Sequence, residues 1–399
     1  MKRSNISRII LFHVTVLVLC FGGMVHAGDA GAMTGEMIQQ AIDRLPADGG
    51  QVDLGEGVWT IRKPLRLKSG SRLCGRGEKT VLLLAGGVQI PCIANSDITN
   101  GNTDVVLCSL LLDGNSAGQT FTSNDWGKRW SAAGLDAVDN VGVYIKGCSN
   151  VLLSNIVVRN FLNEAVMAVR CGGIQVMQCT FSNICQSNSP RNDFAQGAFY
   201  TRYAADCLFV SNVFLDCHEG GIALGFGSDR NRLIGNRSER SPSGEGFFVG
   251  CGSGNLFLGN TVRYSSHAGG GTGAGISASV PPSIDKDKYP AVRNMMISNI
   301  IEHTGGNGIT VMRADNATVS GNIIRYGNEN GNRNQGGIKI YMSANAVIDG
   351  NILESCAGAG IVIQSSSGAA VSSNRISGCP EGVKKDNAPD TSEHGNDVR

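Results

Sequence analysis

The chain has 399 residues, of which 55 are glycine, 17% are charged and 6% are aromatic. Its 41% share of hydrophobic residues is too high for a disordered chain, and its formal net charge of +1 provides no basic excess for releasing counterions from nucleic acid. A nucleic-acid partner is therefore not expected, and the length suits either a few average domains or one long all-β domain.

The amino terminus has the pattern of a secretory signal peptide, over residues 1–27. Basic residues precede an apolar run at 9–21, and the segment ends in Val25-His26-Ala27. An uncleaved signal anchor is the alternative, although the run is short for a membrane-spanning helix. We therefore expect a secreted or periplasmic protein with no stable membrane insertion after cleavage.

A short helix is predicted over 34–45. Ile38, Ala41 and Ile42 lie on one helical face, and Pro46 ends the segment. Such a helix can cover the open edge of the β-structure that we expect to follow it.

A long loop at 113–141 contains Trp126 and Trp130, with Lys128 and Arg129 between them. Tryptophan rings suit stacking against sugar faces, and the two cations suit acidic substituents. Packing of both rings onto the body of the protein is the alternative. Trp126 and Trp130 are thus candidate substrate-binding residues.

From residue 141 onward one sequence motif recurs. It is a glycine followed by alternating apolar residues, a gap, a second alternating run and then an amide residue. The amide position is occupied in order by Asn155, Gln178, Asn212, Asn236, Asn260, Asn299, Asn322, Asn351 and Asn374. Successive amide positions are separated by a short minimum number of residues, which some coils exceed by varying amounts. This pattern is typical of a solenoid whose coils carry loops of different length.

The alternating runs predict β-strands, because apolar residues recur at every second position. We expect each asparagine to form a tight left-handed corner and to bond to the equivalent amide in the next coil. The variable loops precede the glycine-initiated strand, so they should emerge along one edge and border a groove.

These phrases, together with 47–54 (ADGGQVDL) and 110–115 (LLLDGN), resemble the right-handed parallel β-helix proteins of the pectate-lyase-like (pectin lyase fold) superfamily. The resemblance covers roughly residues 37–382. It implies an all-β solenoid of about ten or more coils over residues 28–383, and a polysaccharide in the groove. Members include lyases, glycoside hydrolases, epimerases and phage tailspikes, so the fold does not select a reaction.

No catalytic residue can be transferred from these enzymes. The groove-strand aspartate pair and the Gly-His-Gly and Arg-Ile-Lys phrases of polygalacturonase-type hydrolases are absent from the sequence, as is the Asp-Pro-His phrase of alginate epimerases.

Charged residues of alternating sign recur three positions after the amide corner in five successive coils. They are Glu239, Arg263, Glu302, Arg325 and Glu354. Equivalent positions in a parallel stack lie about 4.8 Å apart, so these residues predict an ion ladder on the outer surface. A charged track for a glycan is the alternative.

Cysteines also recur in register, with Cys148 preceding Cys171 by one coil and Cys356 preceding Cys379. Stacked core thiols and disulfides between neighbouring coils are both compatible with this spacing. No spacing typical of a zinc site occurs, so no metal is predicted from these cysteines. Calcium remains possible as a cofactor, although no EF-hand-like spacing is present.

Three loop residues form the candidate catalytic cluster: His218, Glu219 and Glu245. Glu219 and Glu245 lie shortly before the groove strands of consecutive coils, so their backbones should be about 5 Å apart. Candidate substrate-binding residues are Arg191 and Asp193 on one flank of the cluster and His267 on the other. Arg333 and Lys339 are further candidates, as cations for an acidic substrate.

Two reactions fit this cluster. In glycoside hydrolysis one carboxyl protonates the leaving oxygen and the other serves as nucleophile or base. In β-elimination Arg191, Arg333 or Lys339 neutralises a uronate carboxylate, while His218 or His267 removes the α-proton. The two glutamates could instead bond exposed loop amides, which would leave a non-catalytic glycan-binding or cell-surface structural protein.

The carboxyl-terminal segment 384–399 is polar and lacks the recurring phrase. We expect it to be a flexible tail that follows the last coil.

Overall fold

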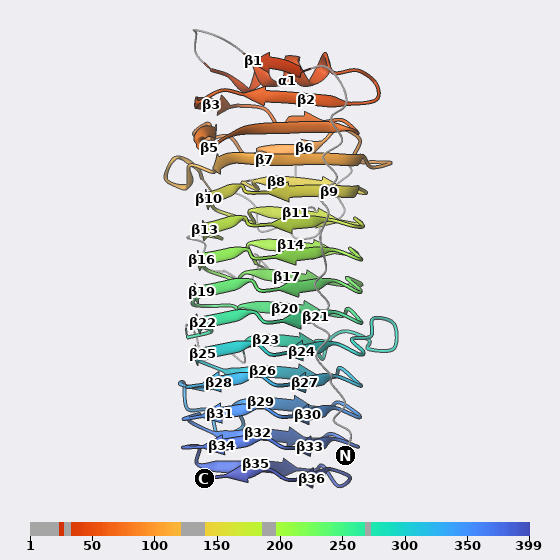
Figure 1. Ribbon diagram of the computed structural model, residues 1–399, viewed down its shortest axis with the longest axis vertical. Coiled ribbons are helices and arrows are strands. Elements are labelled where there is room, and N and C mark those ends of the chain that lie inside the picture. The colour runs from red at the N-terminus through yellow and green to blue at the C-terminus, as the bar shows by residue number, and fades with distance from the viewer. Residues whose placement is uncertain (1–23, 28–32, 121–139, 186–196, 268–272) are drawn as a thin grey trace, which may run out of the picture.

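The computed structural model describes residues 24–27, 33–120, 140–185, 197–267 and 273–399. They form a right-handed parallel β-helix, as the sequence predicted, with the coils stacked from the amino-terminal to the carboxyl-terminal end (Figure 1). Each regular coil contributes one strand to a 12-stranded sheet, called sheet B, and two strands to a 25-stranded sheet, called sheet A.

Sheet B is made, from the amino-terminal end, of β4 (Leu65–Leu67), β6 (Ile93–Asn95), β8 (Val143–Lys146), β11 (Val166–Val169), β14 (Phe199–Arg202), β17 (Ile222–Gly225), β20 (Phe247–Gly250), β23 (Ala274–Ser279), β26 (Asn307–Met312), β29 (Gly336–Tyr341), β32 (Ala359–Gln364) and β35 (Glu381–Asp386). Every strand in it pairs in parallel with the strand one coil away.

Sheet A has two strips. The first strip, A1, contains β9 (Ser149–Ser154), β12 (Gln175–Met177), β15 (Leu208–Val210), β18 (Arg232–Ile234), β21 (Leu256–Leu258), β24 (Met295–Ile297), β27 (Thr318–Ser320), β30 (Val347–Asp349), β33 (Ala370–Ser372) and β36 (Ser392–His394). The second strip, A2, contains β10 (Val157–Phe161), β13 (Thr180–Ile184), β16 (Val213–Cys217), β19 (Arg237–Ser241), β22 (Thr261–Ser265), β25 (Ile300–Thr304), β28 (Ile323–Arg325), β31 (Ile352–Glu354), β34 (Arg375–Ser377) and β37 (Asp397–Val398).

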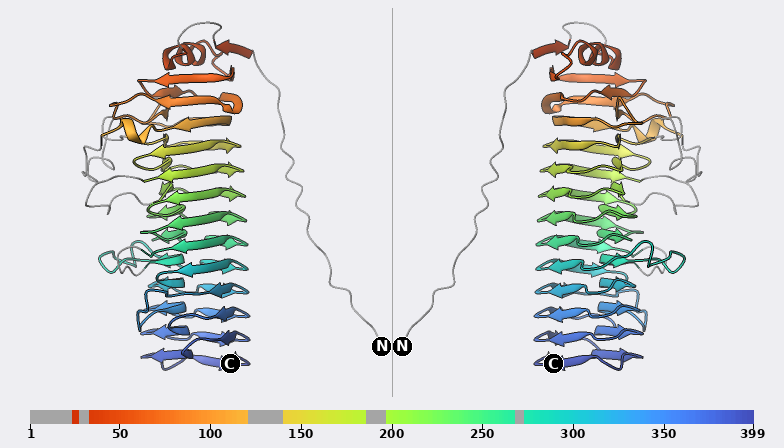
Figure 2. Two further views of the ribbon diagram at one scale, coloured as in Figure 1. Left: turned by 90° about the vertical axis from the view of Figure 1, so that its left-hand side faces the viewer. Right: turned by 90° about the vertical axis from the view of Figure 1, so that its right-hand side faces the viewer.

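The first coils are less regular. They contain β1 (Met24–Ala27), β2 (Gly50–Leu54), β3 (Gly57–Ile61) and the long strands β5 (Ser71–Leu84) and β7 (Thr103–Asp113), which run through both strips. A 3-10 turn at Ser116–Gly118 follows β7. Farther along, the connection between β23 and β24 stands out from the side of the stack (Figure 2).

Every second side chain of sheet B and of the strips A1 and A2 points into the interior of the β-helix and fills it. Phe181 stacks on Phe214 of the next coil, with ring centroids 4.8 Å apart, and both rings are fully buried. The recurring glycine before sheet B is needed for close approach: a Cβ at Gly308 would lie 2.4 Å from the Ile324 side chain and 2.7 Å from the Gly337 carbonyl oxygen. The glycine column therefore lets the backbone turn tightly over the core.

An asparagine ladder joins A1 to A2, and its buried members are Asn212, Asn236, Asn260, Asn299, Asn322, Asn351 and Asn374. Each side-chain oxygen accepts hydrogen bonds from the previous member, as where the backbone N and Nδ2 of Asn236 donate to Asn260 Oδ1 at 2.9 and 3.0 Å. Asn396 extends the ladder at its end. The predicted bond from amide to amide is confirmed.

Two details of that prediction are wrong. The left-handed residue is the one before the asparagine, such as Ser211 (φ 54°) or Gly235 (φ 62°), because the buried amide must point inward while the preceding residue makes the corner. Asn155 and Gln178 occupy this preceding position, so they are not ladder members. A second, shorter ladder of Asn231, Asn255 and Asn294 lies at the corner between sheet B and A1.

The predicted ion ladder is present. Arg263 pairs with Glu302 at 2.8 Å, and Arg325 pairs with Glu302 at 3.0 Å and with Glu354 at 2.7 Å. Glu239 is the first member, 3.7 Å from Arg263. The whole series follows the register of A2.

The stacked cysteines are buried or partly buried free thiols at Cys148, Cys171, Cys356 and Cys379. A disulfide instead joins Cys74 and Cys108, on the neighbouring strands β5 and β7. This pair lies before the regular coils, and the recurring spacing did not predict it.

The two ends of the helix are closed differently. Helix α1 (Gly35–Asp43) lies over the first coil, slightly shorter than the predicted 34–45, and buries Ile38, Ala41 and Ile42. At the other end the prediction of a flexible tail over 384–399 is wrong. These residues belong to β35, β36 and β37, which pair in register with the preceding coil.

The polar composition of this last coil has a structural cause. Lys385 and Glu393 take the positions that Ile363 and Val371 occupy one coil earlier. Lys385 Nζ lies 2.6 Å from Glu393 Oε1. Inward-facing charges at an edge oppose the pairing of another strand, so this ion pair closes the core with a polar surface.

Most of the predicted signal peptide, residues 1–23, lies outside the described residues. Its last four residues form β1, which pairs with β2. Among the described residues, no helix is long and apolar enough to span a membrane.

Candidate active site

The candidate site lies where each coil turns from A2 to sheet B. At this corner every coil places one left-handed residue whose side chain points outward, and successive coils stack these residues in a column. In order they are Asn160, Asn183, Asp216, Arg240, Tyr264, His303, Tyr326 and Ser355. The fold imposes the backbone conformation throughout the column, so the chemistry depends on which side chain occupies each position.

A cleft of about 610 Å³ opens beside this column. It is lined by Asp216, His218, Arg240, Pro242, Tyr264 and His267. Two of the predicted site residues, His218 and His267, therefore face one cavity, although they come from turns two coils apart. Arg240 is held in the wall by Asp216, with Nε and Nη2 at 2.6 and 2.7 Å from its two carboxylate oxygens.

His218 connects the cleft to the turn behind it. Its Nδ1 lies 3.0 Å from Glu219 Oε1, and its Nε2 lies 3.3 Å from Ser243 Oγ of the next coil. The backbone N–H of Ser243 also donates to the His218 carbonyl oxygen at 3.1 Å. The histidine is thus fixed by hydrogen bonds from both coils.

Glu245 lies in the same turn of the next coil, opposite Gly220 in the register of sheet B. Burial is the main reason that the pKa of Glu245 is raised to about 7, and the neighbouring charge of Glu219 contributes to the same rise. The structure therefore brings the predicted residues His218, Glu219 and Glu245 together, with one carboxyl group that holds its proton near neutral pH.

His267 belongs to a second hydrogen-bonded group. Its Nε2 lies 2.7 Å from Glu329 Oε2, and His303 Nδ1 lies 2.8 Å from Glu329 Oε1. Burial alone would raise the pKa of Glu329, but the hydrogen bonds from both histidines lower it below its ordinary value. Glu329 was not predicted from the sequence, because its loop has a length that the repeat does not determine.

Tyr264, His303 and Tyr326 form an aromatic stack along the corner column. The ring centroids are 4.8 Å apart between Tyr264 and His303 and 4.6 Å apart between His303 and Tyr326, and the planes are nearly parallel. Tyr264 is the end of the stack nearest Arg240, and it is 49% exposed in the cleft wall. An exposed aromatic ring at the end of a stack is a suitable platform for a sugar ring.

The predicted residues Lys339 and Arg333 are not part of this cleft. Lys339 on β29 is four strands from β17 in sheet B, which corresponds to about 19 Å. It is close to the Tyr341 ring, and burial and the charge of Lys384 lower its pKa. Lys384 Nζ donates to the Arg333 carbonyl oxygen at 3.3 Å. These three residues form a separate basic patch.

The other predicted substrate-binding residues, Arg191, Asp193, Trp126 and Trp130, lie outside the described residues. Within the described ranges, no group of three or more His, Cys, Asp or Glu side chains is arranged to hold a metal ion.

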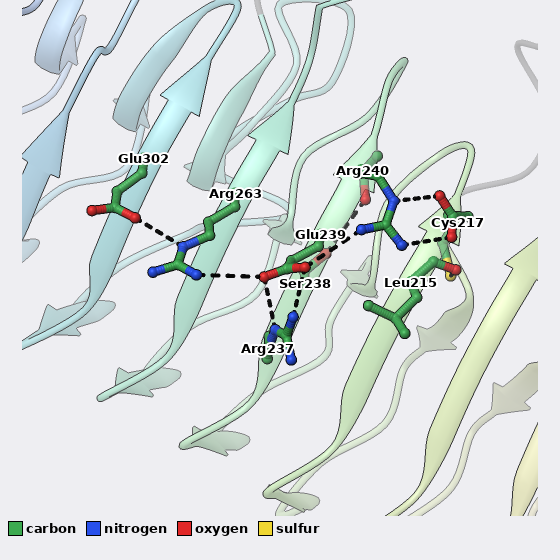
Figure 3. Close-up of polar contacts among 10 residues, drawn as sticks. Leu215, Cys217, Arg237, Ser238, Glu239, Arg240, Arg263 and Glu302 are labelled. Carbon is green, nitrogen blue, oxygen red and sulfur yellow. Dashed lines mark hydrogen bonds and ion pairs between the residues drawn. The ribbon is translucent and has the colours of Figure 1, made fainter.

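The corner column runs beside the ion ladder, because from Arg240 onward each corner residue directly follows a ladder residue. Arg240 contacts a member of each. Its Nη1 lies 3.5 Å from Glu239, which also pairs with Arg237 at 2.7 Å (Figure 3). The cleft wall is thereby tied to a continuous network of charges on A2.

Several solved structures resemble this chain. The A-module of mannuronan C-5 epimerase AlgE6 from Azotobacter vinelandii is 15% identical, with 92% of this chain and 95% of that chain covered and a TM-score of 0.56. An exopolygalacturonase from Thermotoga maritima is 11% identical over 94% and 92%, with a TM-score of 0.58. The Streptococcus pneumoniae surface protein and adhesin PfbA is 14% identical over 91% and 96%, with a TM-score of 0.56.

At such low identity these likenesses establish the fold alone. A search of curated proteins finds no match. The right handed beta helix region family matches residues 141–284 and 284–392, which is more than half of the sequence. The chain therefore belongs to the right handed beta helix family.

Proposed function

We propose that this chain is an exported carbohydrate-active protein that cleaves glycosidic bonds of an extracellular polysaccharide in the cleft beside His218. The observation that carries the proposal is the unequal pair of neighbouring carboxyl groups. Glu245 is half-buried and its pKa is raised to about 7, whereas Glu219 is hydrogen-bonded to His218. Glycoside hydrolysis requires one carboxyl group that is protonated and one that is ionised.

Glu245 is the general acid in this proposal. Near pH 7 it retains a proton that it can donate to the leaving glycosidic oxygen. Glu219 is the carboxylate that acts as base or nucleophile, and the hydrogen bond with His218 Nδ1 orients it. Tyr264 provides the platform for one sugar ring.

Hydrolysis is favoured over β-elimination by the positions of the cations. Elimination needs a cation that neutralises the uronate carboxylate beside the base. Lys339 lies about four coils from His218. Arg240 lines the cleft, but it is paired with Asp216.

The basic patch at Lys339, Lys384 and Arg333 supports an acidic polymer as substrate. Lys339 and Lys384 occupy equivalent positions on β29 and β35, with Val362 of β32 between them. A chain that extends from the cleft along sheet B would bring acidic substituents to this patch.

The test is product analysis with a panel of uronate-containing and neutral polysaccharides. Reducing ends without absorbance of an unsaturated product indicate hydrolysis, and both together indicate elimination. We expect Glu245→Gln to lower turnover by about 10²–10⁴-fold, and wild-type turnover to fall as the pH rises through about 7, because the general acid loses its proton.

Glu354→Gln is the matched control, since Glu354 belongs to the ion ladder and lies away from the cleft. Retained turnover in Glu245→Gln would overturn the assignment of the acid. Binding without cleavage by the wild-type protein would favour the glycan-binding or cell-surface structural alternative.

A further inference from the structure

Ser243, His218 and Glu219 are arranged in a hydrogen-bonded relay, and the glycosidic reaction proposed above gives Ser243 no role. Ser243 Oγ lies 3.3 Å from His218 Nε2, and the other ring nitrogen of His218 lies 3.0 Å from Glu219 Oε1. We propose that this relay is a hydrolytic site in which Ser243 is the nucleophile, and that it removes ester groups from sugar hydroxyls of the polysaccharide.

The protonation of the histidine follows from its two partners. The ionised carboxylate of Glu219 can only accept a hydrogen bond, so His218 Nδ1 carries the proton. In the neutral ring Nε2 then has a lone pair, which can accept the hydroxyl proton of Ser243. Serine, histidine and a carboxylate in this order are the elements of an activated nucleophile, and their spacing is often looser in the absence of substrate.

The local backbone holds the two coils in this register. The N–H of Ser243 donates to the His218 carbonyl oxygen, so the nucleophile is positioned by the residue that would activate it. Gly244 has no space for a side chain, because a Cβ there would meet the backbone of Glu219. The relay is therefore built on packed backbone that joins consecutive coils.

The residue after the nucleophile can supply an oxyanion donor. Among the described residues, the N–H of Gly244 donates no hydrogen bond, while its carbonyl oxygen accepts one from Ser266 Oγ at 3.0 Å. A backbone N–H adjacent to the nucleophile can stabilise the negative oxygen of a tetrahedral intermediate.

The reaction balances with water as the only co-reactant. Ser243 Oγ attacks the ester carbonyl carbon while His218 Nε2 takes the hydroxyl proton. The C–O bond to the sugar then breaks, and His218 returns the proton to the leaving sugar oxygen, which leaves an acyl group on Ser243. Water, deprotonated by His218, hydrolyses this acyl-enzyme to a carboxylic acid and free Ser243.

The cleft determines the class of ester. His218 and Pro242, the neighbour of Ser243, both line the 610 Å³ cavity, and Tyr264 lies in its wall. An acylated sugar placed against Tyr264 would lie in the same cavity as His218, the residue that activates Ser243. The choice of a sugar ester rests on the proposed function, whereas hydrolysis of an ester as such does not.

The first test uses the full chain with 4-nitrophenyl acetate. We expect Ser243→Ala to lower kcat/KM by about 10²–10³-fold, and Ser320→Ala, on the outside of A1, to leave it unchanged. A fluorophosphonate probe should label the wild-type protein at Ser243, as located by peptide mass mapping. Ester hydrolysis that persists in Ser243→Ala, or a label at another residue, would overturn the proposal, and the label decides if the variant fails to fold.

The second test uses an O-acetylated polysaccharide with the wild-type protein. Released acetate reports the ester reaction and new reducing ends report glycosidic cleavage, so the failure of one proposal is distinguishable from the failure of the other. We expect acetate to be released. No acetate from any acetylated polymer, together with no turnover of 4-nitrophenyl acetate, would show that the relay is not catalytic.

Discussion

Glu239 and Glu245 belong to the same coil, yet their surroundings place them in opposite states. The carboxylate of Glu239 is surrounded by three arginines, with Arg237 at 2.7 Å, Arg240 at 3.5 Å and Arg263 at 3.7 Å. The hydrogen bond with Arg237 is the main reason that its pKa is lowered. Within the described residues no Lys or Arg pairs with Glu245, and burial raises its pKa to about 7.

The comparison shows that burial alone does not decide the role of a carboxyl group in this fold. The side chain of Glu239 is only 8% exposed, but the arginines keep it charged and make it part of the structure. Glu245 has Glu219 as its charged neighbour, which disfavours ionisation. A carboxyl group kept near its titration point is suited to proton transfer, and one held by cations is suited to joining coils.

The largest expected effect concerns the stability contributed by Glu245. Its pKa is about 7 in the folded protein against an ordinary value of 4.5, so the folded state retains a proton that the unfolded state has released. Stability is therefore lost as the pH rises from about 4.5 to about 7, by about 3 kcal/mol for this group. Glu245→Gln should remove that loss, which urea unfolding at pH 4.5 and pH 8 measures.

The informative quantity is the difference in unfolding free energy between Glu245→Gln and the wild type. The variant should become more stable relative to the wild type as the pH rises from 4.5 to 8. The same difference for Glu354→Gln should stay nearly constant over this range. A difference for Glu245→Gln that does not change with pH would show that the carboxyl group is ionised in the folded protein.

The stability that Glu239 contributes should depend on pH with the opposite sign. Because its pKa is lowered in the folded state, the stability that it contributes is present above the ordinary pKa and is lost as the pH falls through the folded pKa. At pH 7 we expect Glu239→Gln to lower the free energy of unfolding by about 2 kcal/mol, because three arginines lose their common partner. Denaturant unfolding at pH 7 measures this change.

Glu354→Gln is also the control here. Glu354 belongs to the same ladder and pairs with two arginines, but its side chain is 28% exposed. Its replacement should cost under about 1 kcal/mol, as is usual for exposed pairs. Equal losses for the two variants would mean that the arginine group around Glu239 is no stronger than an ordinary surface pair.

The fold could be predicted because one coil repeats the constraints of the next. The residues three positions after the buried asparagines lie in register in five coils. Glu239 and Glu354 were therefore correctly placed in one ladder. The same reasoning failed at Asn155, since the left-handed corner and the buried position are adjacent and both favour asparagine. The last coil was missed because Lys385 and Glu393 replace apolar core residues, a substitution that resembles the composition of a tail.

The candidate site was only partly predictable for a related reason. His218, Glu219 and Glu245 lie in short turns next to sheet B, where the register still limits their positions. The partners Ser243 and Glu329 depend on how each turn folds over its neighbour, which the repeat does not specify. Arg333 belongs to such a variable loop, and the structure places it with Lys384 instead of with the cleft.

The smallest expected effect concerns the ion pair in the cleft wall. Two substitutions distinguish the stability contributed by the ion pair from the stability contributed by the left-handed backbone at Asp216. Asp216 and Arg240 are 53% and 50% exposed, so Asp216→Asn should cost about 0.5 kcal/mol by thermal unfolding. Asparagine keeps the tolerance for the left-handed conformation at φ 55°, whereas Asp216→Ala loses it and should cost about 1 kcal/mol more.

Asp206 provides a matched control for this prediction. It pairs with Arg230 at 2.8 Å, both side chains are 61% exposed, and both residues are left-handed, at the corner between sheet B and A1. Arg230 has no contact with a ladder glutamate among its described ion pairs, whereas Arg240 also contacts Glu239. If Asp216→Asn costs the same as Asp206→Asn, the two corner pairs are equivalent and the link through Arg240 to Glu239 stabilises nothing further. A larger cost at Asp216 would show that the cleft wall and the ion ladder are energetically coupled.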